Sequence, residues 1–356
     1  MVEAAQIFIL GLGVSWSKKK ETPLRHELLT TLLRDVSRSF YLTLRVIPHQ
    51  VRTPIGLAYL LARASDTIAD TTIVPWEHRK IALAQLRNRI LGCQTELELS
   101  AIAQHQGMPE ERRLLEHIDQ ALEILNSQST QDRSLIRKVL DTITCGQEFD
   151  LEHFGDSSGS TIHALPTWDA LDDYTYQVAG CVGEFWTETC LNHLPHAPKD
   201  RRDELLQLGV RFGKGLQLVN ILRDIPADLR SGRCYLPASE LSHHGLKPID
   251  LLSSENSVRF SGYYGTLIDR TEDHLRAGWD YTNHLPRSWV RVRLACAWPI
   301  LIGLATLGKL RHTSILDARQ KVKISRCEVR KIIAKTVLLY PFPSRWRSLG
   351  ELGKSR

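Results

Sequence analysis

The chain has 356 residues, of which 42% are hydrophobic and 24% charged, an ordinary globular composition with enough apolar residues for a sizeable core. Its net charge of +6 comes without concentrated Lys/Arg runs, so the sequence predicts no nucleic-acid partner and favours anionic small molecules or lipid headgroups. Seven scattered cysteines without a Cys-x-x-Cys pair argue against a disulfide framework or a zinc site and favour a reducing cytosol.

Residues 1–21 are expected to form a flexible extension. Their apolar run, IFILGLGV, is too short to span a membrane, and the lysines at 18–20 lie on the wrong side of it for a signal peptide. The glycines of this segment are not followed by the Gly-Lys-Ser/Thr of a phosphate-binding loop. No stretch of the chain reaches about 18 uninterrupted apolar residues, so we predict no transmembrane helix.

Helix signals recur from residue 22 onward, and strand signals do not. Proline or a hydroxyl-bearing capping residue marks most of the expected starts, and SRCE at 325–328 forms a capping box. The expected helices cover about 22–47, 53–74, 75–91, 109–125, 131–154, 167–194, 198–230, 257–284 and 288–310, with a last one from 325. This pattern predicts one all-α domain over 22–340, with helices packed around a central space, and a basic tail over 341–356.

An acidic pair lies on the helix expected after residue 53. Asp66 and Asp70 are one helical turn apart in the stretch YLLARASDTIAD. Tyr59 and Arg63 precede them at helical spacing and share their face of the helix. Two carboxylates one turn apart form an oxygen-rich patch suited to Mg²⁺, although a single pair of this kind is most often a solvated face.

A second patch of the same kind lies in GLQLVNILRDIPADLRSGRCYLP. Asp224 and Asp228 are again one turn apart, and Gln217 and Asn220 precede them on the same helical face. Pro226 stands between the two aspartates and predicts either a kink or a loosened last turn at Asp228.

Two facing helices that each present Asp-x-x-x-Asp can hold several divalent ions, and the natural guest of such a cluster is a diphosphate. Neighbouring arginines would grip the diphosphate as it leaves. If an allylic carbon carries it, the remaining carbocation needs a dry apolar cavity and aromatic faces. Aromatic residues at helical spacing are more often simply core. The candidates for the lining are Phe40, Tyr41, Tyr59, Tyr174, Tyr176, Phe185 and Trp186.

Several motifs resemble, in order, those of the squalene/phytoene synthase family, the head-to-head prenyl synthases. The likeness covers about residues 30–335. It includes the family's opening motif, both aspartate-rich regions, the YxxxVAGxVG helix and the C-terminal segments. These are SRSFYLTLRVIP (37–48), AYLLARASDTIAD (58–70), YTYQVAGCVG (174–183), QLVNILRDIPADLRSGRCYLP (217–237), ACAWPILIGLATL (295–307) and VKISRCEVRKI (322–332).

The resemblance implies an all-α isoprenoid-synthase fold and Mg²⁺-dependent condensation of two identical prenyl diphosphates through a cyclopropyl intermediate. By position, the implied metal ligands are Asp66, Asp70, Asn220, Asp224 and Asp228. The implied substrate-binding residues are Ser37, Arg38, Ser39, Phe40, Arg63, Gln217, Asn220, Arg223 and Arg233. Tyr59 would lie beside the reacting carbons, where a phenol can steer a proton and stabilise cationic charge.

Gln177 departs from the family pattern. Squalene synthases of the eukaryotic type carry a tyrosine directly before the VAG, whereas the nearest phenols here are Tyr174 and Tyr176. Glutamine cannot replace the chemistry of a phenol. We therefore treat all three residues as catalytic candidates, together with Tyr59, Arg63, Asp66, Asp70, Asp224 and Asp228.

The product class depends on whether a reductant is used. Squalene formation needs hydride from NADPH, whereas phytoene-type formation loses a proton instead. DTIADT (66–71) and VKI (322–324) look more like squalene synthases, and FYLTLRVIP (40–48) is shared with phytoene-type enzymes. We favour squalene from farnesyl diphosphate through presqualene diphosphate, with NADPH contacted by Lys323 and Arg326. Phytoene or dehydrosqualene synthesis is the alternative.

A non-catalytic assembly factor of the same fold is a further alternative, which the four intact aspartates argue against. The tail SRWRSLGELGKSR is basic and polar, with a lone Trp346, and we expect it to carry no membrane anchor. We expect it to be unstructured or to lie on a membrane surface. The protein is expected to be a cytoplasmic monomer, with peripheral membrane contact for product release as a further expectation.

Overall fold

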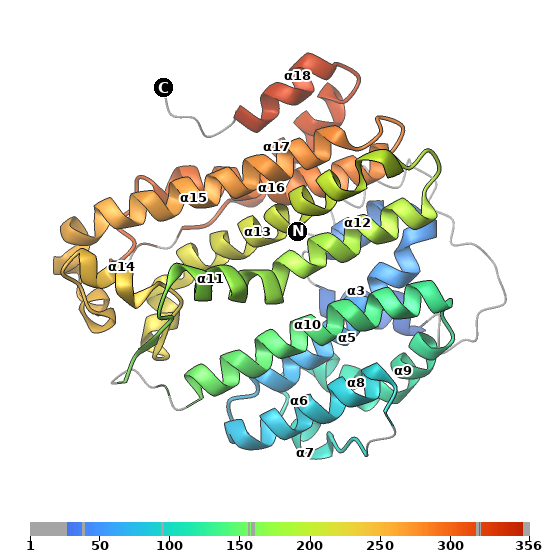
Figure 1. Ribbon diagram of the computed structural model, residues 1–356, viewed down its shortest axis with the longest axis horizontal. Coiled ribbons are helices and arrows are strands. Elements are labelled where there is room, and N and C mark those ends of the chain that lie inside the picture. The colour runs from blue at the N-terminus through green and yellow to red at the C-terminus, as the bar shows by residue number, and fades with distance from the viewer. Residues whose placement is uncertain are drawn as a thin grey trace.

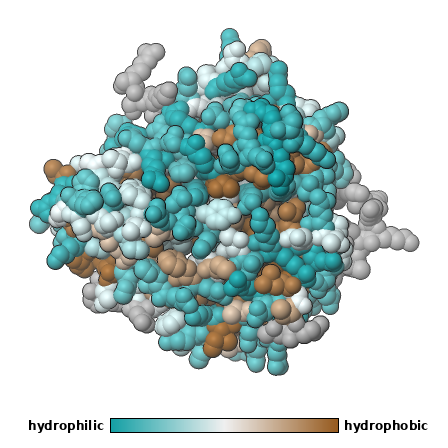
Figure 2. Space-filling view, in the orientation of Figure 1, coloured by the Kyte–Doolittle hydropathy of each residue, from teal (hydrophilic) through white to brown (hydrophobic). Residues whose placement is uncertain are grey.

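The computed structural model describes residues 27–37, 40–93, 96–155, 157, 161–317, 320 and 322–351. Within these ranges the chain is a bundle of helices, as the sequence predicts, and Figure 1 shows its longer helices lying side by side. Apolar side chains gather inside the bundle, and the face drawn in Figure 2 is mostly hydrophilic with small apolar patches. The expected N-terminal extension and two site candidates, Arg38 and Ser39, lie outside the described residues.

The first half of the bundle is built around helix α5, His49–Asp70. The other elements of this half are η2 Leu28–Leu32, α3 Leu33–Ser37, α4 Tyr41–Val46, α6 Trp76–Leu91, α7 Ser100–Gln104, α8 Pro109–Glu116, α9 Ile118–Asn126 and α10 Thr130–Phe154. Helix α10 lies along α5 and α6, while α8 and α9 cover α5.

The second half is built around the long helix α13, Arg202–Arg230. α12, Cys181–His193, and α15, Ser257–His284, flank α13, and α12 also contacts α5 and α10, so it joins the halves. α16, Val290–Leu310, packs on α13 and α15. The remaining elements are α11 Trp168–Thr175, η4 Tyr176–Gly180, η5 Lys199–Arg201, α14 Ala238–His243, η6 Pro248–Leu252, η7 Ser254–Asn256, α17 Arg326–Leu339, α18 Pro343–Arg347 and η8 Ser348–Glu351.

Local signals in the sequence set many of the helix ends. Thr167 caps α11 by accepting the backbone N–H of Ala170 at 3.3 Å. The predicted capping box is also present, since Ser325 Oγ accepts the Glu328 N–H at 3.2 Å and the Glu328 carboxylate accepts the Ser325 N–H at 2.8 Å. α6 ends at Gly92, whose φ of +100° is a conformation that side-chain-bearing residues rarely adopt.

Three helix predictions require correction. α5 begins at His49 rather than at residue 53, so Pro54 lies inside the helix, near its start. The helix expected over 109–125 breaks at His117, whose φ of −108° and ψ of 20° leave the helical region. The helix expected over 167–194 contains the π-helical segment η4. Apolar periodicity does not encode such start points, breaks or π-helical segments.

A short parallel strand pair was not predicted. β1, His163–Ala164, pairs with β2, Arg233–Cys234. The His163 N–H donates to the Gly232 carbonyl at 3.0 Å, and the Leu165 N–H donates to the Cys234 carbonyl at 3.1 Å. Two residues are too few to show an alternating pattern, so this pairing left no signal in the sequence. Its effect is to fix the backbone on both sides of Arg233.

The expectation of an unstructured tail is wrong for residues 343–351, which form α18 and η8. Trp346 is only 2% exposed, and its ring stacks on Trp279 with the ring centroids 5.4 Å apart. The Trp346 indole N–H donates to Asn283 Oδ1 at 3.0 Å. These contacts anchor the segment to α15, which a count of basic residues does not reveal.

Among the described residues, α16 alone is long and apolar enough to cross a membrane, with a mean hydropathy of 1.5 over its best window. The sequence predicted no such helix, because Arg291 and Arg293 interrupt its apolar run. In the folded chain 72% of that window is buried. Such burial is typical of a core helix, and α16 packs against α13, α15 and α17.

Helices α12 and α13 approach each other at glycines. A Cβ added at Gly183 would overlap the Gly209 carbonyl, and one added at Gly213 would overlap the Ala179 carbonyl. Only residues without a side chain allow the two backbones to come so close. This contact holds α13, and with it the second acidic pair, against η4 and α12.

Gly183→Ala is therefore expected to lower the free energy of unfolding by about 1–3 kcal/mol, because the added methyl group must push two backbones apart. The matched control is Gly262→Ala on α15, where nothing lies within 4 Å of an added Cβ. That change is expected to be neutral or slightly stabilising, since alanine has the higher helix propensity. Urea denaturation measures both changes. Unaltered stability in Gly183→Ala would contradict the close contact.

Candidate active site

The second aspartates of the two acidic pairs, Asp70 and Asp228, share one neighbouring arginine, Arg233. Asp70 ends α5, and Asp228 lies in the last turn of α13. Burial raises the pKa of both carboxyls, and in both cases the nearby Arg233 charge opposes that rise. One guanidinium is therefore within electrostatic reach of both pairs, although their first aspartates are 158 residues apart in the sequence (224 − 66).

On α5, Arg63 links the first pair to a second helix. Its guanidinium donates to Asp66 and to Glu111 of α8. Burial, and next the charge of Asp70, raises the pKa of Asp66 to about 6. When both carboxylates of such a pair ionise, the surroundings do not fully neutralise their negative charge. A bound cation would neutralise that charge.

On α13, the helix continues through Pro226 to Arg230, so the predicted kink or loosened turn does not remove Asp228 from the helix. Pro226 cannot donate to the carbonyl of Leu222, and that carbonyl instead accepts the hydroxyl of Tyr264 at 3.2 Å. Burial, and next the charge of Asp224, raises the pKa of Asp228 to about 7. Asp228 therefore resembles Asp66 in the direction and the causes of its pKa shift.

The arginine beside the second pair lies on α13 itself. Arg223 Nε donates to Asp224 Oδ1 at 2.9 Å, and its Nη2 donates to the other oxygen of the same carboxylate. Both side chains are about two-fifths exposed, at 39% and 43%. A ligand can therefore reach this ion pair from solvent and compete for either partner.

Sequence reasoning missed four residues around the acidic pairs. Asp150 on α10 forms an ion pair with Arg233 at 3.3 Å and accepts the Tyr235 hydroxyl at 2.9 Å. Glu111 holds Arg63, as described above. Arg79 of α6 donates to the Ala69 carbonyl at the end of α5. Only Tyr235 belongs to a quoted motif, so position within that motif was the single signal that could have found any of them.

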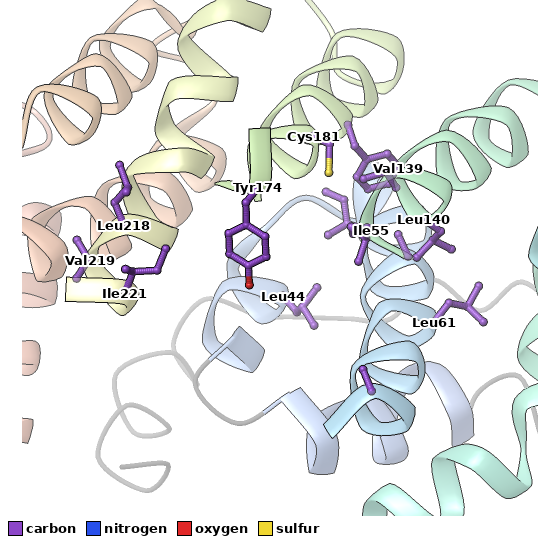
Figure 3. Packing of buried hydrophobic residues seen from close by; sticks show 14 of the residues in the cluster. Leu44, Ile55, Leu61, Val139, Leu140, Tyr174, Cys181, Leu218, Val219 and Ile221 are labelled. Atoms are coloured by element: carbon purple, nitrogen blue, oxygen red, sulfur yellow. The ribbon is translucent and has the colours of Figure 1, made fainter. Parts of the chain in front are cut away.

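Tyr174 and Tyr176 point to different places. The Tyr174 hydroxyl lies beside Asp150, and its ring stacks on Tyr235 with centroids 5.0 Å apart. Figure 3 shows this ring projecting between α13 and α5. The Tyr176 hydroxyl instead donates to Glu184 of α12 at 3.0 Å, away from Asp150. Of the two tyrosine candidates, the structure brings Tyr174 to the site.

Gln177 lies on η4 against α10. A Cβ added at Gly146 of α10 would lie 3.0 Å from the Gln177 Cβ, so the two segments are in close contact there. The amide therefore lies beside α10, the helix that carries Asp150.

Three further candidates lie toward the N-terminal side. Tyr59 stacks on Phe40, with ring centroids 4.6 Å apart and 20° between the planes. This pair presents aromatic faces one helical turn before Arg63. Ser37 is buried, and its hydroxyl donates to the Leu33 carbonyl of its own helix.

The remaining predicted site residues differ in position and exposure. Gln217 is half-buried and Asn220 is exposed on α13. The proposed NADPH contacts, Lys323 and Arg326, are exposed at the start of α17. A small pocket also opens at the end of α13. It is lined by Ile221, Ile225, Asp228, Leu229, Arg233, Cys234, Tyr235 and Leu236.

The described residues contain no group of three or more His, Cys, Asp or Glu side chains arranged to hold a metal ion by themselves. The candidate donors are carboxylates, two on α5 and two on α13. This set fits Mg²⁺, which is commonly held by one or two carboxylates while phosphate oxygens and water complete its shell. The metal-ligand assignment of Asp66, Asp70, Asn220, Asp224 and Asp228 stays a prediction.

The chain is similar in sequence to known prenyl synthases. The squalene/phytoene synthase family model matches residues 33–328. A bifunctional lycopene cyclase/phytoene synthase of Gibberella fujikuroi is 31% identical over 243 residues, which are 67% of this chain and 40% of that protein. A squalene synthase of Gibberella zeae is 27% identical over 227 residues, 64% of this chain and 46% of that protein.

The fold agrees as well. A ligand complex of TcSQS superimposes with a TM-score of 0.74 at 18% identity, covering 94% of this chain and 93% of that one. The chain thus spans less than half the length of these two curated relatives but nearly all of the solved structure. With the family match covering most of its length, this chain belongs to the squalene/phytoene synthase family.

Proposed function

We propose that this protein condenses two identical prenyl diphosphates head to head. The observation that carries the proposal is the placement of Arg233 within electrostatic reach of both acidic pairs. A site with carboxylates on two sides and arginines among them suits a ligand that arrives as an anion together with cations. A prenyl diphosphate complexed with Mg²⁺ is such a ligand.

In this proposal, polar residues of the site would bind the diphosphate and its cations, and aromatic residues would contact the reacting carbons. Mg²⁺, when bound, would supply the positive charge that makes diphosphate a good leaving group. Arg233 and Arg223 would hold the phosphate oxygens through guanidinium N–H groups. The stacked pair of Tyr59 and Phe40 would present aromatic faces to the cationic carbon left behind. Tyr174, held beside Asp150, would offer a hydroxyl on the opposite side.

We further propose farnesyl diphosphate as the substrate and squalene as the product, with NADPH as the hydride donor. The motifs DTIADT and VKI support this choice. Phytoene or dehydrosqualene synthesis without a reductant is the second candidate, favoured by the phytoene synthase of Gibberella fujikuroi among the relatives. A non-catalytic role is disfavoured, because the acidic residues are present on both helices.

Product analysis distinguishes these possibilities. Purified protein is incubated with farnesyl diphosphate and Mg²⁺, with and without NADPH, and the hydrocarbons are extracted and identified. Squalene that forms only with NADPH is the expected result. Dehydrosqualene from farnesyl diphosphate, or phytoene from geranylgeranyl diphosphate without any squalene, would overturn the product assignment while leaving the head-to-head chemistry intact. No condensation product from either substrate would overturn the proposed function itself.

A further inference from the structure

Arg233 is the arginine that both acidic pairs share, and its own support comes from a third helix. Its guanidinium Nη1 lies 3.3 Å from Asp150 Oδ2. The other oxygen of the Asp150 carboxylate accepts the Tyr235 hydroxyl at 2.9 Å. Asp150 therefore uses both oxygens, one on Arg233 and one on the residue two positions after it.

The backbone beneath Arg233 is held as well. β2 pairs with β1 on both sides of this residue. The His153 ring, one turn after Asp150 on α10, contacts the Ala164 carbonyl of β1 at 3.1 Å. Asp150 and the strand pair thus connect α10 to the segment that carries Arg233 at more than one point.

Asp150 and Arg233 are both partly buried, since their side chains are 19% and 27% exposed. Burial raises the pKa of Asp150, whereas Arg233 and the hydroxyls of Tyr235 and Tyr174 oppose the rise. An ion pair in such surroundings is oriented more firmly than one in water, because fewer water molecules compete for the charged groups. Removing one partner leaves the other free to turn.

We propose that Asp150, together with Tyr235, is a positioning residue that directs the Arg233 guanidinium toward Asp70 and Asp228 and so sets the affinity for diphosphate. Asp150 contacts no substrate in this account and acts only through Arg233. The inference rests on the proposed function, since it assigns a role to Arg233 in binding the diphosphate. It adds α10 to the helices that build the site.

The test combines Asp150→Asn with Arg233→Gln in a double-mutant cycle. Asp150→Asn keeps the size of the side chain and removes the charge. It is expected to raise KM for the prenyl diphosphate and the inhibition constant of inorganic pyrophosphate in parallel, by at least about tenfold, with a smaller change in kcat. In the Arg233→Gln background the same change is expected to have little further effect, because the group through which it acts is already gone.

Two companion variants separate positioning from general damage. Asp150→Glu keeps the charge and is expected to recover part of the lost pyrophosphate affinity. Asp141→Asn is the matched control, because Asp141 lies on the same helix and pairs with Arg87 at 2.7 Å instead. It is expected to bind pyrophosphate like wild type. Circular dichroism melting of each variant checks that the fold is retained.

The outcomes are distinct. Effects of Asp150→Asn and Arg233→Gln that add fully would overturn the positioning role, as would wild-type pyrophosphate inhibition in Asp150→Asn. A wild-type protein without activity on any prenyl diphosphate would overturn the proposed function. In that case direct calorimetric binding of pyrophosphate with Mg²⁺ still tests whether Asp150 acts through Arg233.

Discussion

Replacing Asp224 by asparagine is expected to lower kcat/KM on the order of 10³-fold while leaving the fold intact, a size typical of removing one preorganised charge-stabilising group. Asparagine has nearly the same shape but no negative charge, so the second acidic pair loses half of its charge. Arg223, which donates two hydrogen bonds to Asp224 in the wild-type structure, also loses its ionic partner. Steady-state kinetics at saturating Mg²⁺ measures the effect.

The control for this variant lies on the same helix. Asp203 is in the first turn of α13, and its side chain is 89% exposed. Asp203→Asn is expected to leave kcat/KM within about twofold of wild type, as surface substitutions usually do. If Asp224→Asn also retains near-wild-type activity, the assignment of the second pair to metal and diphosphate is wrong.

Lowering the pH is expected to reduce activity and to stabilise the unliganded fold. The pKa of Asp66 is raised to about 6 and that of Asp228 to about 7, in each case first by burial and then by the neighbouring aspartate. Cation binding needs both groups ionised. We expect kcat/KM to fall by about tenfold or more per pH unit below about pH 6.5.

The free energy of unfolding of the unliganded protein is expected to change in the opposite direction to activity, rising as the pH falls. Between the unfolded carboxyl value of 3.8 and the raised folded values, the folded chain holds more protons than the unfolded chain. The contribution of these groups to the free energy of unfolding therefore falls as the pH rises through this window. Without divalent cations, Asp228→Asn is expected to melt at a higher temperature than wild type at pH 8, and the difference is expected to narrow steadily as the pH falls toward 3.8. A variant that is less stable than wild type at pH 8 would contradict this electrostatic account.

Much of the fold could be predicted because local signals and tertiary packing agree. Helix α15 covers 257–284, as apolar periodicity and Pro286 indicated. Ser325 forms its capping box because both partners are three residues apart in the chain. Signals of this kind are complete within one helical turn, so a single sequence contains them.

Features that depend on distant partners could not be predicted. Pro226 sits within α13, where Tyr264 of another helix satisfies the carbonyl that the proline leaves free. Trp346 lies in a basic segment, and only its contacts with α15 reveal that it is buried. The π-helical segment η4 and the β1–β2 pair likewise depend on neighbours far away in the chain.

The same distinction between local signals and distant contacts applies to the candidate site. Asp66, Asp70, Asp224 and Asp228 were found because each pair repeats at helical spacing, and the structure places Arg233 within electrostatic reach of Asp70 and Asp228. Asp150 could not be found from spacing, since no second carboxylate lies three or four residues away on α10, and its partner Arg233 comes 83 residues later. Tyr176 was counted beside Tyr174 because they are neighbours in sequence, although its hydroxyl donates to Glu184.

The central claim is that the two acidic pairs form one site for a diphosphate and its cations. Calorimetric titration of inorganic pyrophosphate into wild type, Asp66→Asn and Asp224→Asn, with Mg²⁺ and with EDTA, tests it most directly. We predict that wild type binds pyrophosphate only with Mg²⁺, and that either single substitution weakens binding on the order of 100-fold, the loss typical of a charged ligand contact. Wild-type binding that persists in EDTA, or either variant binding as tightly as wild type, would contradict it.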